Sequence, residues 1–145
     1  ELDRASSKTG ETAQQNFSKF GNGQIPTDAL APIGVGTHRL WDPAADAFKK
    51  LQRAAKAEGV DIAVESSYRP YGKQVELAKD LGLYSQGGKA AAPGTSNHGW
   101  GISLDLQLSP RAQSWMKQNA SQFGFANDVA REPWHWTYRS ERSGS

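Results

Sequence analysis

The stretch SNHGWGISLDL, residues 96–106, alternates apolar side chains with small or polar ones from Gly101 onward. Residues two apart share one face of a β-strand, so one face of a strand here is apolar and belongs in a core: Ile102, Leu104 and Leu106. The opposite face carries Asp105 beside small neighbours, which leaves open space above the sheet. The stretch therefore predicts a strand over residues 101–108 with one carboxylate turned away from the core.

The rest of the chain predicts helices and short strands in mixed order. The first helix is expected to begin with Asp42 as its N-cap and Pro43 as its first helical residue, and to stop at Gly59. The spacing of apolar residues, together with prolines and glycines that end regular structure, predicts the other elements. They are helices at 70–81 and 110–123, strands at 60–65 and 134–138, and loops at 24–40 and 84–95. This order predicts an α+β fold, a small antiparallel β-sheet with helices packed against it, in a single domain.

Length and composition narrow the class of protein. A chain of 145 residues can bury one hydrophobic core. Residues 1–23 are polar and irregular and are expected to be a flexible N-terminal tail or linker, with the folded domain at 24–145. A net charge of +2, with Lys and Arg dispersed, argues against nucleic acid as a partner. No apolar run approaches the roughly 20 residues of a membrane span, and the absence of cysteine excludes disulfides and thiolate metal ligands.

Two histidines and two carboxylates could form a hydrolytic zinc site. Gly99 and Gly101 give the backbone freedom to bring His98 beside Asp105, and the segment EPWHW at 132–136 adds a second histidine and a glutamate. Three protein ligands leave a fourth position for water, whose pKa zinc lowers to about 7. A carboxylate outside the ligand set could then take the proton of that water and pass it to a leaving amine.

Structural roles explain the same residues one at a time. Asp105 could cap a turn and Glu132 could be a surface carboxylate, while either histidine alone could be structural; His38 is assigned no function. The spacing also differs from the compact helical His-Glu-x-x-His pattern of many zinc peptidases. The spacing alone therefore leaves the zinc site and the structural roles open.

Three ordered motifs resemble the signature motifs of one family. They are SSYRPYGKQ at 66–74, SNHGWGISLD at 96–105 and EPWH at 132–135. This pattern is similar to that of the VanY-like D-alanyl-D-alanine carboxypeptidases and dipeptidases, the zinc metallopeptidases of family M15. The resemblance covers roughly residues 30–138. One departure is Ser103, at a position usually occupied by alanine, where the hydroxyl could add a hydrogen bond to the Asp105 carboxylate.

The resemblance implies a role for each motif residue. The ligands of one zinc ion per chain would be His98, Asp105 and His135. Glu132 would be the general base and later the proton donor, and Arg69 would stabilise the oxyanion. For substrate binding, Ser96 would hold the substrate and Gln74 matches the family's glutamine, while Tyr84 and Trp134 are expected to line the cleft.

The implied function is hydrolysis of peptidoglycan stem peptides, with removal of a terminal D-Ala as the first hypothesis. An endopeptidase that cuts within the stem or cross-bridge, as phage or bacterial lysins do, is the alternative. A zinc-stabilised wall-binding module without catalysis is disfavoured, because Glu132 and Arg69 are both present. The protein is expected to be a monomer that acts outside the cytoplasm or reaches the wall with a phage, and to be excised from a longer precursor, since the chain starts at Glu1.

Overall fold

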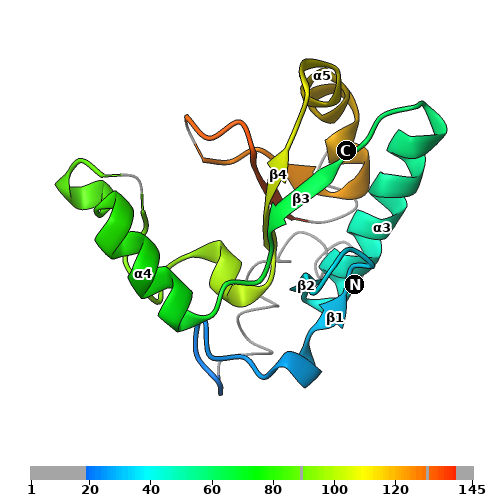
Figure 1. Cartoon of the computed structure of the whole chain (residues 1–145). Helices are drawn as coiled ribbons and strands as arrows, with labels where there is room; N and C mark the ends of the chain where they lie inside the picture. The colour runs from blue at the N-terminus through cyan, green and yellow to red at the C-terminus, as the bar shows by residue number, and fades with distance from the viewer. Residues whose placement is uncertain (1–18, 89, 130, 140–145) are drawn as a thin grey trace.

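The protein folds around a four-stranded antiparallel sheet (Figure 1). The structure is a computed structural model that describes residues 19–88, 90–129 and 131–139, without the side chain of Tyr84, so most of the expected tail lies outside the described residues. The strand order is β3-β4-β6-β5, with bounds Ala63–Ser66 for β3, Ser103–Gln107 for β4, Phe125–Ala126 for β5 and His135–Tyr138 for β6. A separate two-stranded sheet pairs β1 (Ala31–Pro32) with β2 (Arg39–Leu40).

Within the described residues, three α-helices flank the sheet, as the α+β prediction requires. They are α3 (Asp42–Ala57), α4 (Tyr71–Leu81) and α5 (Pro110–Asn119). In Figure 1, α3 and α5 lie to one side of the sheet and α4 stands apart on the other. Short 3-10 helices connect these elements: η1 (Thr27–Ala29), η2 (Tyr84–Gln86), η3 (Asn97–Trp100) and η4 (Ala120–Phe123). None of the described helices is long and apolar enough to cross a membrane.

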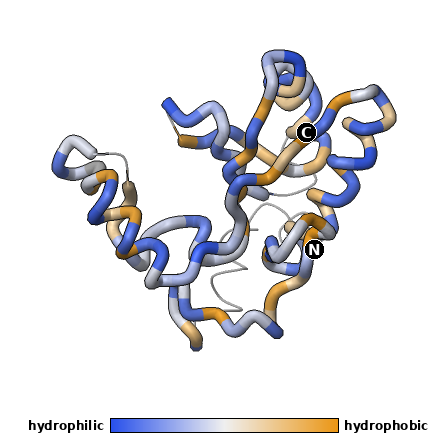
Figure 2. The backbone as a smooth tube through the Cα atoms, viewed as in Figure 1, coloured by the Kyte–Doolittle hydropathy of each residue, from blue (hydrophilic) through white to orange (hydrophobic). Residues whose placement is uncertain are grey.

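The core lies between the sheet and the pair α3 and α5. Phe48 of α3 meets Phe125 of β5 edge-on, with ring centroids 5.9 Å apart. The apolar face predicted for β4 is buried here, since Ile102, Leu104 and Leu106 are all at most 3% exposed. Figure 2 shows hydrophobic and hydrophilic residues interleaved along α3 and β4, as expected for elements with one face in a core. Burial of such side chains, at about 25 cal/mol per Å² of apolar surface, is the main force that holds β4 in place.

The N-terminus of α3 differs from the prediction by one residue. Trp41 is the N-cap and Asp42 the first helical residue, and no side chain caps the helix. Tertiary contacts explain the different helix start, because the Trp41 N–H donates to the carbonyl of Gly101 at 2.8 Å and the indole of Trp41 is buried. By contrast, Ser109 caps α5 as its sequence suggests, accepting from the Ala112 N–H at 3.1 Å.

Several short strands depart from the predicted bounds. β3 begins later than residue 60 and continues to Ser66, and β6 begins at His135 rather than 134. The stretch 24–40, predicted as loop, contains η1 and the β1–β2 pair. β5 was not predicted at all. Strands of two residues are too short to show an alternating pattern, which explains why the sequence does not reveal them.

The segment just before Gln24 is attached to the domain. The Gly23 N–H donates to Gly99 O at 2.9 Å, and the Tyr71 N–H donates to Gly23 O at 2.8 Å. The Asn22 side chain is buried and its Nδ2 donates to Ser96 O at 2.7 Å. Residues 22 and 23 therefore bridge the start of α4 and η3.

Candidate metal centre and active site

His98 belongs to η3 rather than to a strand. Ser96 caps this short helix by accepting from the His98 N–H at 3.1 Å. Gly101 then turns the chain with φ of +74°, the left-handed conformation that glycine adopts at low cost. Gly99 has a different reason to be glycine, because a Cβ there would lie 1.8 Å from Asn22 Oδ1. The expectation that both glycines give backbone freedom therefore holds for Gly101 only.

A hydrogen bond determines which nitrogen of His98 faces the centre. His98 Nδ1 lies 2.8 Å from the backbone oxygen of Ser67. A carbonyl oxygen only accepts, so Nδ1 carries the proton. The unprotonated Nε2 then faces Asp105, with its Oδ1 at 3.2 Å. Burial lowers the pKa of His98, although Asp105 opposes this effect, and a neutral imidazole is the form that binds a metal.

Sheet register brings the third candidate ligand, His135, to the same place. Asp105 of β4 pairs directly with His135 of β6, and His135 Nδ1 lies 3.3 Å from Asp105 Oδ1. One ligand atom from each of His98, Asp105 and His135 falls within 4.8 Å of the other two. Two imidazole nitrogens and one carboxylate oxygen form a donor set that suits zinc. The described residues therefore fit the metal that the sequence motifs imply.

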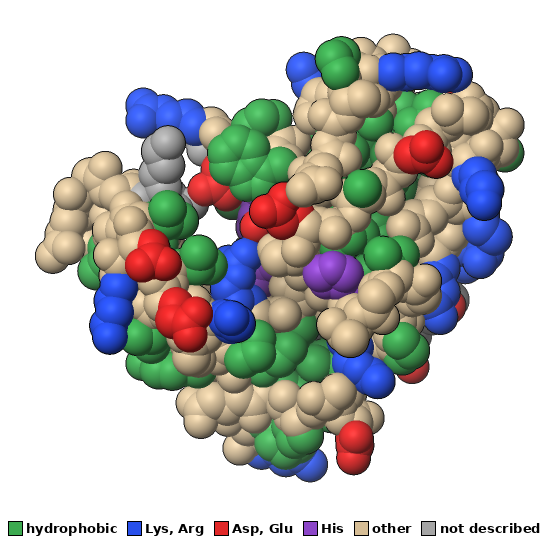
Figure 3. Space-filling view, in the orientation of Figure 1, with side chains coloured by type: hydrophobic (Ala, Val, Ile, Leu, Met, Phe, Trp, Pro, Cys, Tyr) green, Lys and Arg blue, Asp and Glu red, His purple; other side chains and the backbone are tan. Residues whose placement is uncertain are grey.

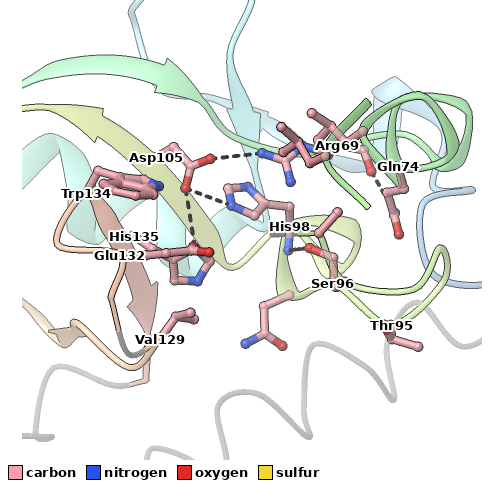
Figure 4. Close-up of a pocket in the computed structure, with 15 residues that line it drawn as sticks. Arg69, Gln74, Thr95, Ser96, His98, Asp105, Val129, Glu132, Trp134 and His135 are labelled. Atoms are coloured by element: carbon pink, nitrogen blue, oxygen red, sulfur yellow. Dashed lines mark hydrogen bonds and ion pairs between the residues drawn. The ribbon is translucent and has the colours of Figure 1, made fainter. Parts of the chain in front are cut away.

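Asp105 divides its two oxygens between the centre and Arg69. Oδ1 faces both histidines, whereas Oδ2 accepts from Arg69 Nη2 at 3.0 Å (Figure 4). Oδ2 also accepts from Ser66 Oγ at 3.0 Å. Burial would raise the pKa of Asp105, but the nearby imidazoles of His135 and His98 and the charge of Arg69 outweigh it and hold that pKa far below its usual range. Asp105 is thus an ionised carboxylate with one oxygen available to a metal.

Glu132 lies at the edge of the same centre. Its Oε1 is 3.8 Å from His135 Nδ1, and its side chain is 15% exposed. Pro133 follows it, and the chain turns there so that the His135 N–H donates to Glu132 O at 3.0 Å. A carboxylate is therefore placed beside the three candidate ligands without belonging to that set, which is the position a general base needs.

A cavity of about 500 Å³ opens in front of this centre. One wall comes from α4 and the chain after it, with Leu77, Leu81 and Ala90, and the opposite wall includes Val129 and Trp134. Figure 3 shows the molecule hollowed between α4, on the left, and the sheet. The polar ligands converge at one end of a largely apolar cleft, as in many small-molecule and peptide sites.

The predicted substrate contacts differ in their surroundings. Ser96 and Trp134 line the cavity, and Trp134 is 42% exposed there. Gln74 is 3% exposed and bonds to protein on both ends, through Nε2 to Asn22 Oδ1 at 3.0 Å and Oε1 to the Gly94 N–H at 2.7 Å. The Tyr84 side chain lies outside the described residues. Contact of any of these four residues with substrate stays a prediction.

The structure adds residues that sequence reasoning missed. Ser66 joins Arg69 to Asp105 (Arg69 Nη2 to Ser66 Oγ, 2.9 Å). The Ser103 hydroxyl makes its hydrogen bond with Thr137 Oγ1 at 2.7 Å and not with Asp105, so the expected partner is wrong. The alternation of His135 and Thr137 along one strand was a signal for Thr137. Ser66 is the first residue of the motif at 66–74, but the motif alone gave it no role.

Gln74→Ala is expected to lower the free energy of unfolding by about 1–3 kcal/mol, because it leaves the buried Asn22 Oδ1 and Gly94 N–H without this partner. Urea unfolding of both metal-free proteins measures the difference. Glu76→Ala on the exposed side of α4 is the matched control, and its exposed ion pair with Lys73 makes a change of under about 0.5 kcal/mol the expectation. Equal effects at the two positions would contradict a supporting role for Gln74.

Comparisons with known proteins agree with the motifs. The family VanY, D-alanyl-D-alanine carboxypeptidase, matches residues 37–141. The chain therefore belongs to the VanY family of D-alanyl-D-alanine carboxypeptidases, within the M15 zinc metallopeptidases, which confirms the resemblance.

Two curated relatives are similar over part of their length. A D-alanyl-D-alanine carboxypeptidase of Enterococcus faecalis is 32% identical and covers 63% of this chain and 45% of its own. The putative carboxypeptidase YodJ of Bacillus subtilis is 29% identical and covers 69% of this chain and 46% of its own. The chain thus spans about half the length of these relatives.

Solved structures share the fold. A mutant of the vancomycin resistance D,D-pentapeptidase VanY in complex with Zn(II) has a TM-score of 0.65 at 25% identity, covering 81% of this chain and 83% of that one. VanYB in complex with D-Alanine-D-Alanine has a TM-score of 0.65 at 25% identity, covering 79% and 78%. The LdcB LD-carboxypeptidase has a TM-score of 0.64 at 25% identity, covering 86% and 77%.

Proposed function

We propose that this chain is a zinc-dependent carboxypeptidase of peptidoglycan stem peptides that removes the terminal residue of a D-Ala-D-Ala end. The observation that carries the proposal is the convergence of the ligand atoms of His98, Asp105 and His135 at one end of the cleft, with Arg69 and Glu132 beside them. The VanY relatives named above, one in complex with Zn(II) and one with D-Alanine-D-Alanine, support the metal and the substrate class.

Each residue has a distinct task in this proposal. Zinc held by the three ligands would supply Lewis-acid activation of a peptide carbonyl and of a water molecule. Glu132, beside the ligands, accepts the proton of that water and returns it to the leaving amine. Arg69 stabilises the negative charge that develops on the carbonyl oxygen. Ser66 and Asp105 hold the Arg69 guanidinium through Nη2, and within the described part of the chain its Nη1 and Nε make no hydrogen bond to protein.

A second cavity favours one alternative, an endopeptidase. It has a volume of about 660 Å³ and shares Arg69, Leu77 and Asp105 with the first. A groove that continues past the catalytic centre could accept a peptide on both sides of the cut bond. We therefore keep cleavage within the stem or cross-bridge as the second candidate.

Peptidoglycan as substrate also leads us to propose that the protein acts outside the cytoplasm or is delivered to the wall by a phage. One chain supplies the three candidate ligands as well as Arg69 and Glu132, which supports action as a monomer.

Mass spectrometry of defined muropeptides after incubation with zinc-loaded protein tests the proposal. Pentapeptide stems ending in D-Ala-D-Ala are expected to lose one terminal alanine, and protein treated with a chelator should leave them intact. Internal cleavage of cross-linked stems would select the endopeptidase instead. Trimming of tetrapeptide but not pentapeptide stems would give the specificity of an L,D-carboxypeptidase. No cleavage of any stem would reject the function.

A further inference from the structure

A set of hydroxyl and carboxylate groups lies behind His135, on the side away from the cavity centre. His135 Nε2 is 3.2 Å from Thr137 Oγ1, and Thr137 Oγ1 is 2.9 Å from Asp128 Oδ1. Ser103 Oγ is 2.7 Å from the same Thr137 oxygen. Ser103 and Thr137 have no measurable exposure, and Asp128 is 19% exposed at its side chain. Three polar groups therefore meet at one buried hydroxyl.

The hydroxyl of Thr137 has one proton to donate, and its neighbours determine where that proton goes. An ionised carboxylate only accepts hydrogen bonds, so Thr137 donates to Asp128. The other two groups must then donate to Thr137 Oγ1, and His135 Nε2 is one of them. This places a proton on Nε2 and leaves the lone pair of Nδ1 facing Asp105 Oδ1 and Glu132 Oε1.

The arrangement parallels that of His98 with a different acceptor. At His98 a backbone carbonyl, Ser67 O, accepts the proton of the nitrogen turned away from the centre. At His135 the acceptor of the corresponding proton is the side-chain hydroxyl of Thr137, and Asp128 orients that hydroxyl. Asp128 Oδ1 lies 3.7 Å from Nε2, beyond hydrogen-bond distance, so Thr137 is the direct partner. Arg139 forms an ion pair with the second oxygen of Asp128 and holds that carboxylate in place.

We propose that Thr137, oriented by Asp128, is a positioning residue that holds the His135 ring and keeps its proton on Nε2, so that Nδ1 is presented to the metal. The inference rests on the proposed function in that it takes His135 to bind the metal. Loss of such an outer partner lowers metal affinity about 10–100-fold. Thr137 does not itself line the cavity, and it contacts His135 at Nε2, away from the nitrogen that faces Asp105, so its effect passes through His135.

Zinc affinity measured by competition with a chromophoric chelator tests the proposal. Thr137→Val keeps the branched shape and removes the hydroxyl, and it is expected to raise the Kd for zinc about 10–100-fold. Thr137→Ser keeps the hydroxyl and should stay within about threefold of the original protein, a rescue by the conservative variant. Ser103→Ala is the matched control, since it removes a neighbouring buried hydroxyl that does not contact His135. It should lower the urea midpoint of unfolding, because a buried hydrogen bond is lost, and leave zinc affinity within about threefold.

Two outcomes would overturn the proposal. One is unchanged zinc affinity in Thr137→Val, and the other is an equal loss of affinity in Ser103→Ala, which would make the effect one of packing. If the unmodified protein binds no zinc, the proposed function itself fails, and the two failures are thereby distinguished. If Thr137→Val does not fold, Asp128→Ala carries the test at a partly exposed site, with a weaker zinc affinity expected and an unchanged one contradicting the proposal.

A spectroscopic measurement separates positioning from general stability. The chain has 3 histidines, so nitrogen-15 spectra of the imidazoles are simple to assign with single variants. In the zinc-loaded protein the proton on His135 Nε2 should exchange slowly with water and show coupling to that nitrogen. In Thr137→Val this signal should be lost or strongly shifted, while the corresponding signal of His98 stays in place. A His135 signal that is insensitive to the substitution would count against the proposal.

Discussion

Glu132→Ala is expected to lower kcat on a stem peptide by roughly 10²–10⁴-fold, the range typical for loss of a general acid or base. The zinc content should not change, because Glu132 lies beside the ligands and is not one of them. The fall in kcat is expected because, among the described residues that line the cavity in front of the metal centre, Glu132 is the only carboxylate besides the candidate ligand Asp105. Turnover measured together with elemental analysis of the purified protein checks both parts.

The control for this variant is Glu58→Ala. Glu58 is exposed and follows the C-terminus of α3, away from the cavity, so its removal should leave kcat unchanged within about twofold. Full activity in Glu132→Ala would reject its role as the base. Loss of zinc together with activity would instead make it a ligand or a support of one.

His98→Ala is expected to lose zinc altogether on dialysis. It removes one of three ligands, and the loss should exceed the about 10–100-fold that follows removal of an outer partner. It also leaves the Ser67 carbonyl without its donor in a buried place, so circular dichroism must confirm that the protein is folded. Elemental analysis after dialysis gives the zinc per chain.

His38→Ala provides a histidine control for that experiment. His38 Nδ1 contacts Ser67 Oγ at 2.9 Å, outside the candidate ligand set, and its loss should leave zinc binding intact. Stoichiometric zinc in His98→Ala would remove His98 from the ligands. Equal zinc loss in both histidine variants would point to a fold defect around Ser67 instead.

The sequence predicted those parts of the fold that depend on local patterns. The alternation of 101–106 correctly predicted that Ile102, Leu104 and Leu106 face the core. Ser109-Pro110 marked the start of α5, because a side-chain cap acts within a few residues. Tertiary contacts decided the parts that were missed. Trp41 precedes α3 because its N–H binds Gly101 across the molecule, and β5 exists only through pairing with β6.

The sequence motifs predicted which residues form the candidate site, but not how those residues are arranged in space. The motifs could not supply the register that sets Asp105 opposite His135, because a shift by one residue would turn the histidine to the other face. They also could not show that His98 sits in a 3-10 helix. The error about Ser103 has the same origin: its partner Thr137 lies on the neighbouring strand, 34 positions away.

The attachment of Asn22 and Gly23 has a mechanical consequence. Gly23 bonds by its backbone to Gly99, the residue after His98, and to Tyr71 at the start of α4. Tension applied through the chain before Phe20 would therefore be carried by these bonds at η3 together with the packing of Phe20 against the core. A fusion to another protein or to a surface anchor should therefore retain residues 20–23. A chain that starts at Gln24 would lack the hydrogen bonds of Asn22 and Gly23 that hold η3, the element that carries His98.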